Sequence, residues 1–313
     1  METNWLEPAP WSRTEEDRRV RELIAVIRQT WAALSVDSAG RGIPSSVRSA
    51  VELLRHHVRQ PYSAEQVEQV LTHRDVSRLH KGLLAKLAEA EAGMELADAL
   101  QLGVRSRLEL DDLGDHGSWR VYETLVGHEL ELLGGLLPAG LPLAFVGSGP
   151  LPLSAVLIHL RQGSPGTCID SGPAACGVSP ALLAVLFHLR QGSPVTCIDS
   201  DPAACAVSRT LLGRLGLKEG IRVVQEEGCA FDYAPYAAVF VASLVSGKAG
   251  VLERIRDTRA DAVVAVRTAE GMRRLMYESV DEAELSAAGW SLLGRTRPAE
   301  RVVINSTLLY RQS

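Results

Sequence analysis

From about residue 140 onward, short apolar runs alternate with segments of helical spacing, and this alternation restricts the possible folds more than any other feature. Short apolar runs separated by helices are typical of parallel strands that are buried on both faces. The alternation therefore predicts an α/β fold with a doubly wound, Rossmann-like sheet. The expected strands are 143–146, 167–169, 196–198, 221–224, 237–241, 262–266 and 302–309.

The first 137 residues have a different pattern, in which apolar positions recur at helical spacing behind capping residues. A capping box, Ser12-x-x-Glu15, opens the first expected helix, and Gly134-Gly135 ends the last. We therefore predict an all-α N-terminal domain over 1–137 and a Rossmann-like domain over 138–313. The expected helices are 12–34, 44–58, one capped by Ser63, 76–102 and 119–133, with a polar break at 111–118.

The long helix 76–102 carries three acids, Glu89, Glu91 and Glu95, beside its apolar positions. Their spacing alone favours a solvated helix face over a binding site.

Composition excludes several classes of function. The formal net charge of −5 gives no electrostatic footprint for nucleic acid, and no apolar run is long enough for a membrane span. The five cysteines form no C-x-x-C pair, so we expect no metal site. The N-terminus does not resemble a secretory signal, and we expect a cytoplasmic protein with reduced thiols.

The stretch 143–153, LAFVGSGPLPL, reads as a buried strand, a glycine turn and the start of a helix. Gly147 and Gly149 allow the backbone to approach a ligand closely, and prolines such as Pro150 are tolerated in a first helical turn. The helix start offers free N–H groups to an anionic group. Gly147, Ser148, Gly149 and Pro150 are therefore candidates for a cofactor loop, although such joints also occur for purely steric reasons.

A tandem duplication follows this turn. Residues 153–179 and 182–208 have the same sequence except at five pairs of positions, with an offset of 29 (153 to 182). Two copies are too few for a solenoid, so we interpret them as a duplicated helix-plus-strand unit. Three of the five differences place glycine in the first copy, which makes the second copy the better helix and strand former.

The duplication provides two acids that could bind ribose hydroxyls at the end of the second strand. Asp170 has the natural spacing from Gly149, whereas Asp199 has the better local sequence, IDSDP, which includes Asp201. Each could instead cap the following helix. A nicotinamide cofactor is disfavoured because Pro152 stands where its fingerprint requires a third glycine, and S-adenosylmethionine fits the same elements.

Several motifs, in this order, resemble those of the nicotianamine synthase family. The resemblance includes the bacterial nicotianamine-synthase-like enzymes that make staphylopine-type opine metallophores, and it covers most of the chain from about residue 85. The motifs are AEAGME (90–95), Y-x-x-L-x-x-x-E (122–129), FVGSGPLPL (145–153), IDSDP (198–202), VFVASLV (239–245), VRTAEG (266–271) with LMY (275–277), and Asn305-Ser306.

The resemblance implies a transferase that moves the 3-amino-3-carboxypropyl group of S-adenosylmethionine onto an amine and releases methylthioadenosine. Histidine is the expected acceptor, giving a metallophore precursor that a separate opine dehydrogenase would complete. A homodimer is one option for its assembly.

The resemblance also assigns roles to residues. Glu129 is the expected base or ammonium-binding acid, and Tyr122 lies two turns earlier on the same helix face. Arg267, expected to be exposed at a strand end, and Tyr277 are candidates for substrate binding. Asp199 and Asp201 join the cofactor site.

Three alternatives remain open from the sequence. The chain could be a nicotianamine synthase proper, making repeated transfers. It could be an ordinary small-molecule methyltransferase. It could also be an inactive paralogue, because the duplicated unit enters beside the expected ribose site.

Overall fold

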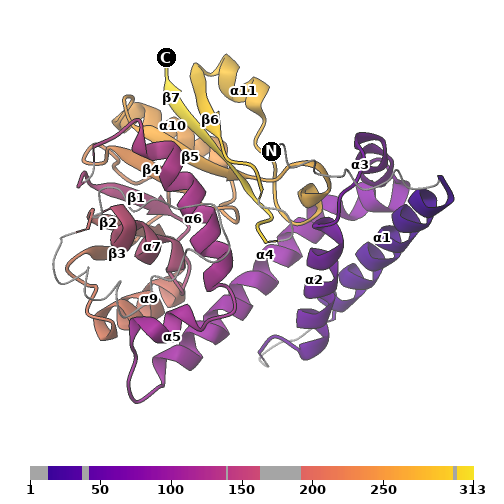
Figure 1. Ribbon diagram of the computed structural model, residues 1–313, viewed down its shortest axis with the longest axis horizontal. Helices are drawn as coiled ribbons and strands as arrows, with labels where there is room; N and C mark the ends of the chain where they lie inside the picture. The colour runs from indigo at the N-terminus through magenta and orange to yellow at the C-terminus, as the bar shows by residue number, and fades with distance from the viewer. Residues whose placement is uncertain (1–12, 37–41, 139, 163–191, 299–301) are drawn as a thin grey trace, which may run out of the picture.

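A seven-stranded sheet with the order β3-β2-β1-β4-β5-β7-β6 forms the centre of the α/β part of the protein, with the N-terminal helices to its right in Figure 1. The computed structural model describes residues 13–36, 42–138, 140–162, 192–298 and 302–313. The strands are β1 (Leu143–Val146), β2 (Val195–Asp199), β3 (Ile221–Gln225), β4 (Ala238–Val241), β5 (Val263–Thr268), β6 (Trp290–Arg295) and β7 (Ser306–Gln312).

The first five strands of this sheet are parallel, and β1 lies between β2 and β4. Because the chain moves outward from β1 in both directions, the carboxyl end of β1 is a topological switch point, where ligands bind in doubly wound folds. The predicted α/β, Rossmann-like fold class is confirmed. Six of the seven expected strands correspond to β1 to β5 and β7, with bounds that differ by a few residues, and 167–169 lies outside the described residues.

Two features near the C-terminus differ from the expectation. Strand β6 was not predicted, because its central residues are exposed and it has no continuous apolar run. It pairs antiparallel with β7, which is itself antiparallel to β5. The run 302–309 becomes a strand only from Ser306.

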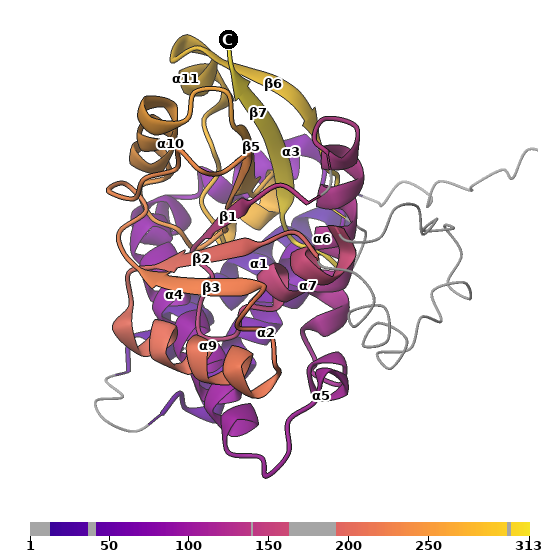
Figure 2. The same ribbon diagram turned by 90° about the vertical axis from the view of Figure 1, so that its left-hand side faces the viewer.

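Helices cover both faces of the sheet, as Figure 2 shows with α6 and α7 on one side and α10 and α11 on the other. Alternate residues of β1 belong to the hydrophobic cores on the two faces of the sheet: Leu143 and Phe145 join one, and Ala144 and Val146 join the other. These helices are α6 (Trp119–Gly134), α7 (Leu153–Gln162), α9 (Pro202–Arg214), α10 (Lys248–Thr258) and α11 (Glu282–Ala287).

The N-terminal part is helical, as predicted, and has its own core. Its helices are α1 (Arg13–Leu34), α2 (Ser45–Val58), α3 (Ala64–Leu71), α4 (Arg74–Gly103) and α5 (Leu110–Gly114). Ser63 caps α3 through a capping box with Gln66. The predicted cap Ser12 lies outside the described residues. Helix α5 forms within the expected polar break, where Glu109 and Asp112 make a second capping box.

The helical core and the core against the sheet meet within α4. Val20 to Met94 form the helical core together with η1 (Gly271–Leu275), which the α/β part contributes. From Ala99 onward the apolar residues, including those of α5 and α6, pack against the sheet. The Arg214 guanidinium also donates to the carbonyls of Gly103 and Arg105, joining α9 to the end of α4. Judged by which core its residues join, the helical part therefore ends within α4, before the boundary expected near residue 137.

The described structure takes its helix from one copy of the duplication and its strand from the other. Helix α7 belongs to the first copy, and β2 belongs to the second. The choice of strand has a physical reason: buried Val195 begins β2 where the first copy has Gly166. Asp201 likewise caps α9 by accepting from the Ala203 N–H at 2.8 Å, a bond that Gly172 of the first copy could not make.

We predict that removing residues 163–191 leaves the fold intact. Gly192 already lies against the end of α7, where a Cβ on it would meet the His159 carbonyl oxygen. The new junction, Gln162 to Gly192, repeats the Gln-Gly junction that both copies contain. Thermal unfolding followed by circular dichroism should give a cooperative transition within a few degrees of the full chain.

A second deletion of equal length, residues 180–208, provides the control. It also leaves a single copy of the duplicated unit, but this copy has Gly166 and Gly172 at the positions that Val195 and Asp201 occupy in the second copy. Loss of a strand former and of a helix cap should cost about 1–3 kcal/mol relative to the first deletion. Equal stability of the two deletions would contradict the assignment of β2 to the second copy.

Candidate functional site

A cavity with about 510 Å³ of empty space opens at the carboxyl ends of the central strands. Its walls come from the loops after β1 and β4, from β5, and from α4 and α6, so it lies between the helical core and the sheet. The site stands at the switch point that the topology creates beside β1.

The glycine turn after β1 forms one wall of this cavity. Gly147 has a φ of 76° and Gly149 a φ of 67°, a region in which side chains are strained. A Cβ at Gly147 would lie 2.4 Å from Val245 Cγ2, and one at Gly149 would lie 2.9 Å from Glu95 Oε1. The turn therefore requires glycine at both positions. Gly147 and Ser148 line the cavity, and Pro150 follows beneath it as a buried residue.

Asp199, at the end of β2, is hydrogen-bonded to this turn. Its Oδ2 accepts from the Gly149 N–H at 2.9 Å, and its Oδ1 accepts from the Asp201 N–H at 3.0 Å. Each carboxylate oxygen keeps a further lone pair for a ligand hydroxyl. Asp201 is exposed and its side chain caps α9. Asp170, the other candidate, lies outside the described residues.

Glu129 and Arg267 form a buried bidentate ion pair. Arg267 Nε donates to Glu129 Oε1 at 2.8 Å and Nη2 donates to Oε2 at 2.9 Å. The Thr307 hydroxyl donates to Oε1 at 2.6 Å, and Ser154 Oγ accepts from Arg267 Nη2 at 3.0 Å. Arg267 is only 4 % exposed, so the expectation of an exposed guanidinium is wrong. Glu129 is 2 % exposed and lies behind Arg267, outside the cavity lining.

Arg267 lines the cavity, and its guanidinium lies near two aromatic rings. Its Cζ lies 5.2 Å from the centre of the Phe145 ring and 6.0 Å from that of Tyr122. Within the described segments, Nη1 is the one nitrogen of this group with no hydrogen-bond partner. Tyr122 also lines the cavity, where burial and then the nearby Glu95 carboxyl raise its pKa.

The acids of α4 correct the sequence-based expectation. Glu89 is exposed, as expected for a solvated face, but Glu91 and Glu95 line the cavity. Burial raises the pKa of Glu95 to about 8, against a backbone hydrogen bond from Leu151 that lowers it. Glu91 accepts from the Tyr277 hydroxyl at 3.0 Å and pairs with Arg55 Nη2 at 2.7 Å. Burial also raises the pKa of Glu91.

Another part of the wall contains Ser243 and Asn305, which lie in two of the sequence motifs but were given no role there, and nearby Lys248, which the sequence analysis did not single out. Asn305 Nδ2 donates to Ser243 Oγ at 2.6 Å, and both residues line the cavity. Lys248, which is 8 % exposed, donates to the Ser243 carbonyl at 2.8 Å and to the Val245 carbonyl at 2.9 Å. Burial lowers the pKa of Lys248 to about 8. This lysine fixes the loop after β4 against Gly147.

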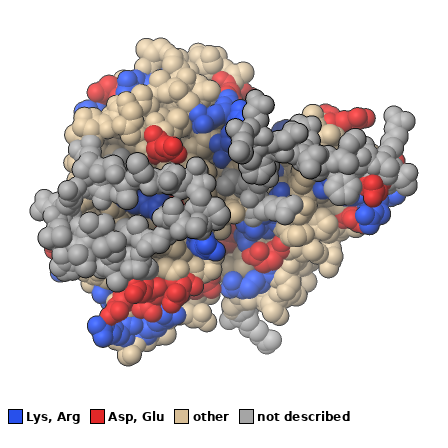
Figure 3. All heavy atoms as spheres, viewed as in Figure 1, with Lys and Arg blue, Asp and Glu red and all other residues tan. Residues whose placement is uncertain are grey.

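Figure 3 shows acidic and basic side chains mixed on the face toward the viewer. Among the described residues, no group of three or more His, Cys, Asp or Glu side chains could hold a metal ion. Each helix in these same ranges is too short or too polar to cross a membrane.

Comparison with known proteins decides the family. The sequence profile described as "Nicotianamine synthase protein" matches residues 51–313. The chain belongs to the nicotianamine synthase family. It is 28 % identical over 247 residues to probable nicotianamine synthase 2 of Hordeum vulgare, covering 76 % of this chain and 66 % of that protein. It is 30 % identical over 210 residues to nicotianamine synthase 1 of Oryza sativa subsp. indica, covering 65 % and 56 %. The chain thus spans less than two thirds of these plant relatives.

Solved structures of the nicotianamine synthase MtNAS share the fold. The complex of MtNAS with MTA and tNA superposes with a TM-score of 0.69 at 17 % identity, covering 97 % of this chain and 100 % of that one. A mutant of MtNAS in complex with S-adenosylmethionine gives 0.68 at 17 % identity, covering 96 % and 99 %. The family resemblance inferred from the sequence motifs is therefore confirmed.

We predict that Glu129→Ala destabilises the protein strongly. Removal of one partner from a buried ion pair leaves an uncompensated charge and typically costs about 3–5 kcal/mol. Urea unfolding at pH 7 measures this loss. The exposed pair of Arg18 and Glu22 is the control, and Glu22→Ala should cost less than about 1 kcal/mol. A loss below 1 kcal/mol for Glu129→Ala would contradict the buried pairing.

We predict that Glu95→Gln stabilises the free protein at alkaline pH. A carboxyl group whose pKa rises from 4.5 to about 8 on folding favours the folded state when protonated, and this stability is lost as the pH rises from 4.5 through 8. Glutamine avoids the buried charge and should gain about 2–4 kcal/mol at pH 8.5, with a smaller gain toward pH 5. Thermal melts across this range measure the difference. Glu89→Gln, at an exposed position of α4, should show none.

Proposed function

We propose that this chain transfers the 3-amino-3-carboxypropyl group of S-adenosylmethionine to an amine and releases methylthioadenosine. The observation that carries the proposal is Glu95, whose carboxyl group has a pKa of about 8 and lines the cavity beside Gly149. An attacking amine is mostly protonated near neutral pH and must lose a proton. A base whose pKa lies close to the working pH is suited to accept it.

The residues at the switch point fit S-adenosylmethionine. The two glycines leave a cradle that a Cβ would fill, and their backbone can approach the amino-acid end of the molecule. Asp199 would hold the ribose hydroxyls with its remaining lone pairs. When bound, S-adenosylmethionine supplies a Cγ–S bond that breaks as the amine nitrogen bonds to Cγ, and the sulfur keeps the electron pair as a neutral thioether.

The chain's own side chains would orient and deprotonate the reactants. Arg267 lines the cavity, and its Nη1, which has no hydrogen-bond partner among the described residues, can donate to the carboxylate of the transferred group. Glu91 and Tyr277, which are hydrogen-bonded to each other, can hold the acceptor ammonium beside Glu95. Glu95 then accepts the proton released from nitrogen. Tyr122, between Glu95 and Arg267, limits the space available to the acceptor and aligns it with the donor carbon.

Glu129 has a positioning role in this proposal. Both of its oxygens are engaged by Arg267 and Thr307, so it holds the guanidinium in place and does not take the acceptor's proton. The half-enclosed cavity adds a further effect. Because positive charge disappears from sulfur during the transfer, reduced solvation by walls such as Phe145 and Leu151 favours the reaction.

The acceptor proposed first is histidine, which would give a precursor of an opine metallophore in the cytoplasm. A separate opine dehydrogenase would complete that product. Repeated transfer to give nicotianamine is the second proposal for the same site. Both use an amine acceptor that carries a carboxylate.

Incubation of the protein with S-adenosylmethionine and a panel of amino acids that includes histidine tests the reaction. Chromatography should show methylthioadenosine, whereas a methyltransferase would release S-adenosylhomocysteine. Glu95→Gln should lower kcat about 10²- to 10⁴-fold, the contribution of a general base.

Titration calorimetry completes this test. S-adenosylmethionine should bind Glu95→Gln about as tightly as it binds the unmodified chain, because Asp199 and the glycine turn are unchanged. Glu89→Gln should keep full activity. Absence of methylthioadenosine with every acceptor, or undiminished activity of Glu95→Gln, would refute the proposal.

A further inference from the structure

A second charged network lies on the helical side of the cavity. Arg55 of α2 pairs with Glu91 of α4, and the Tyr277 hydroxyl donates to the same carboxylate. Arg55 also contacts Glu52. Glu91 and Tyr277 line the cavity, so this network connects α2 to the helical side of the cavity. Each charge of this network has an opposite charge or a hydrogen-bond partner beside it.

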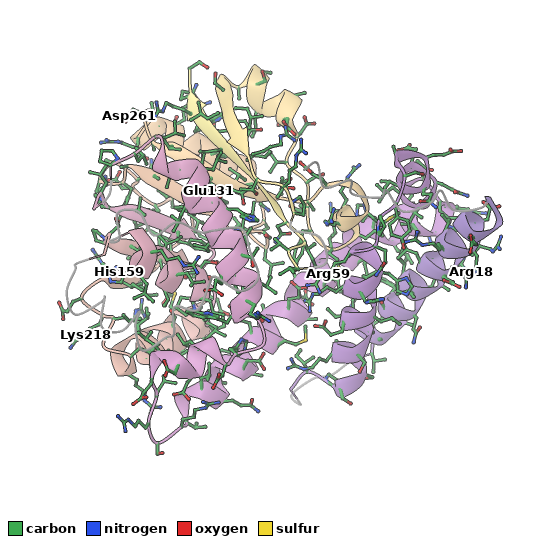
Figure 4. All side chains as sticks on the ribbon, in the orientation of Figure 1. Arg18, Arg59, Glu131, His159, Lys218 and Asp261 are labelled. Atoms are coloured by element: carbon green, nitrogen blue, oxygen red, sulfur yellow. The ribbon has the colours of Figure 1, made fainter. Side chains whose placement is uncertain are left out.

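Arg59, one turn after Arg55, differs from these residues. It is the C-cap residue of α2 and is half-buried, and its Nε atom is buried. Throughout the part of the chain that the structure describes, this Nε has no hydrogen-bond partner and no carboxylate pairs with the guanidinium. Figure 4 shows Arg59 at the end of α2 that approaches the α/β part.

The charges around Arg59 are mainly positive. Arg55, Arg273, Glu52 and the Tyr277 hydroxyl are close enough to act on it electrostatically. Glu52 is already engaged by Arg55. Burial, followed by the repulsion from Arg55, lowers the pKa of Arg59. A partly desolvated cation beside other cations is unfavourable unless an anion joins it.

Local helix chemistry does not provide that anion. A cation at a helix C-terminus gains from the helix dipole, but the last carbonyls of α2 accept from other donors. The His57 carbonyl accepts from the Gln60 N–H, and the His56 carbonyl accepts from the Gln60 side chain. The guanidinium of Arg59 therefore keeps its donors for a planar anion, which arginine binds with two parallel hydrogen bonds.

We propose that Arg59 binds the carboxylate of the acceptor amino acid. This inference rests on the proposed function and adds a second carboxylate site to it. Arg267 belongs to the α/β wall, next to the glycine turn, and serves the donor's carboxylate. Arg59 lies on the helical side, outside the cavity lining but within electrostatic range of Tyr277, which lines it, and serves the acceptor's carboxylate. One guanidinium from each part of the chain thus holds one of the two substrates.

The test compares L-histidine with histamine, which has the same amine and imidazole but lacks the carboxylate. Arg59→Gln should raise the KM for L-histidine at least tenfold and change kcat less than threefold. It should leave kcat/KM for histamine unchanged. Arg59→Lys, which retains the charge without the planar fork, should give an intermediate KM. Arg18→Gln, on the exposed face of α1 at the far end of the molecule in Figure 4, is the matched control and should match the unmodified chain.

Equilibrium binding separates this proposal from the proposed function. By calorimetry, L-histidine should bind the unmodified chain at least tenfold more tightly than Arg59→Gln, whether or not turnover occurs, and S-adenosylmethionine should bind both equally. The melting temperature of Arg59→Gln should equal or exceed that of the unmodified chain, because a cation without a partner is removed. Equal losses with L-histidine and histamine, unchanged binding of L-histidine, or a lowered melting temperature would overturn the assignment to Arg59.

Discussion

The buried pair of Glu129 and Arg267 holds the architecture of the site together. It joins α6 to β5, and the hydroxyls of Thr307 and Ser154 extend it to β7 and α7. Four elements from distant parts of the chain thus meet at one guanidinium. Because removing both charges from water is costly, such a pair adds little net stability. Its main effect is to fix the positions of the groups that it joins. Here the geometry it provides is an arginine that lines the cavity near the rings of Phe145 and Tyr122 and has one nitrogen without a partner among the described residues.

The cavity exists because two hydrophobic cores meet without merging. The apolar residues of α4 change sides along its length: Leu83 and Leu87 pack in the helical core, while Ala99 and Leu102 pack on the sheet. The acids between them cannot enter either core and therefore face the gap. Their burial in that gap is what raises the pKa of Glu95 to about 8. The same packing that joins the two parts of the chain creates the chemical property on which the proposed reaction depends.

The sequence predicts most of the sheet because each central strand is buried on both faces and so appears as a continuous apolar run. It also predicts the glycine turn, because few residues other than glycine adopt the positive φ that the turn has at Gly147 and Gly149. Edge strand β6 has no such run and escapes detection. The pattern around Glu91 and Glu95 shows that they share a helix face, but it does not show what covers that face.

The burial of Arg267 is equally hidden from local sequence. The residue ends a parallel strand, a position that is often open to solvent, and it is covered here by α6 and by antiparallel β7. Both elements are far from it along the chain. Local patterns therefore identify the residue types of the site, whereas long-range packing decides which oxygen and nitrogen atoms remain available to a ligand.

The mixed origin of α7 and β2 has a consequence for how this gene can change. The two copies are identical from His159 to Pro165 and from His188 to Pro194. A crossover anywhere within those seven codons would remove one unit of 29 codons and preserve the reading frame. Every such crossover yields the same shorter protein, with Ser154 from the first copy and Val195 and Asp201 from the second. The duplication can therefore be lost in a single genetic event that leaves every described residue of the cavity lining unchanged.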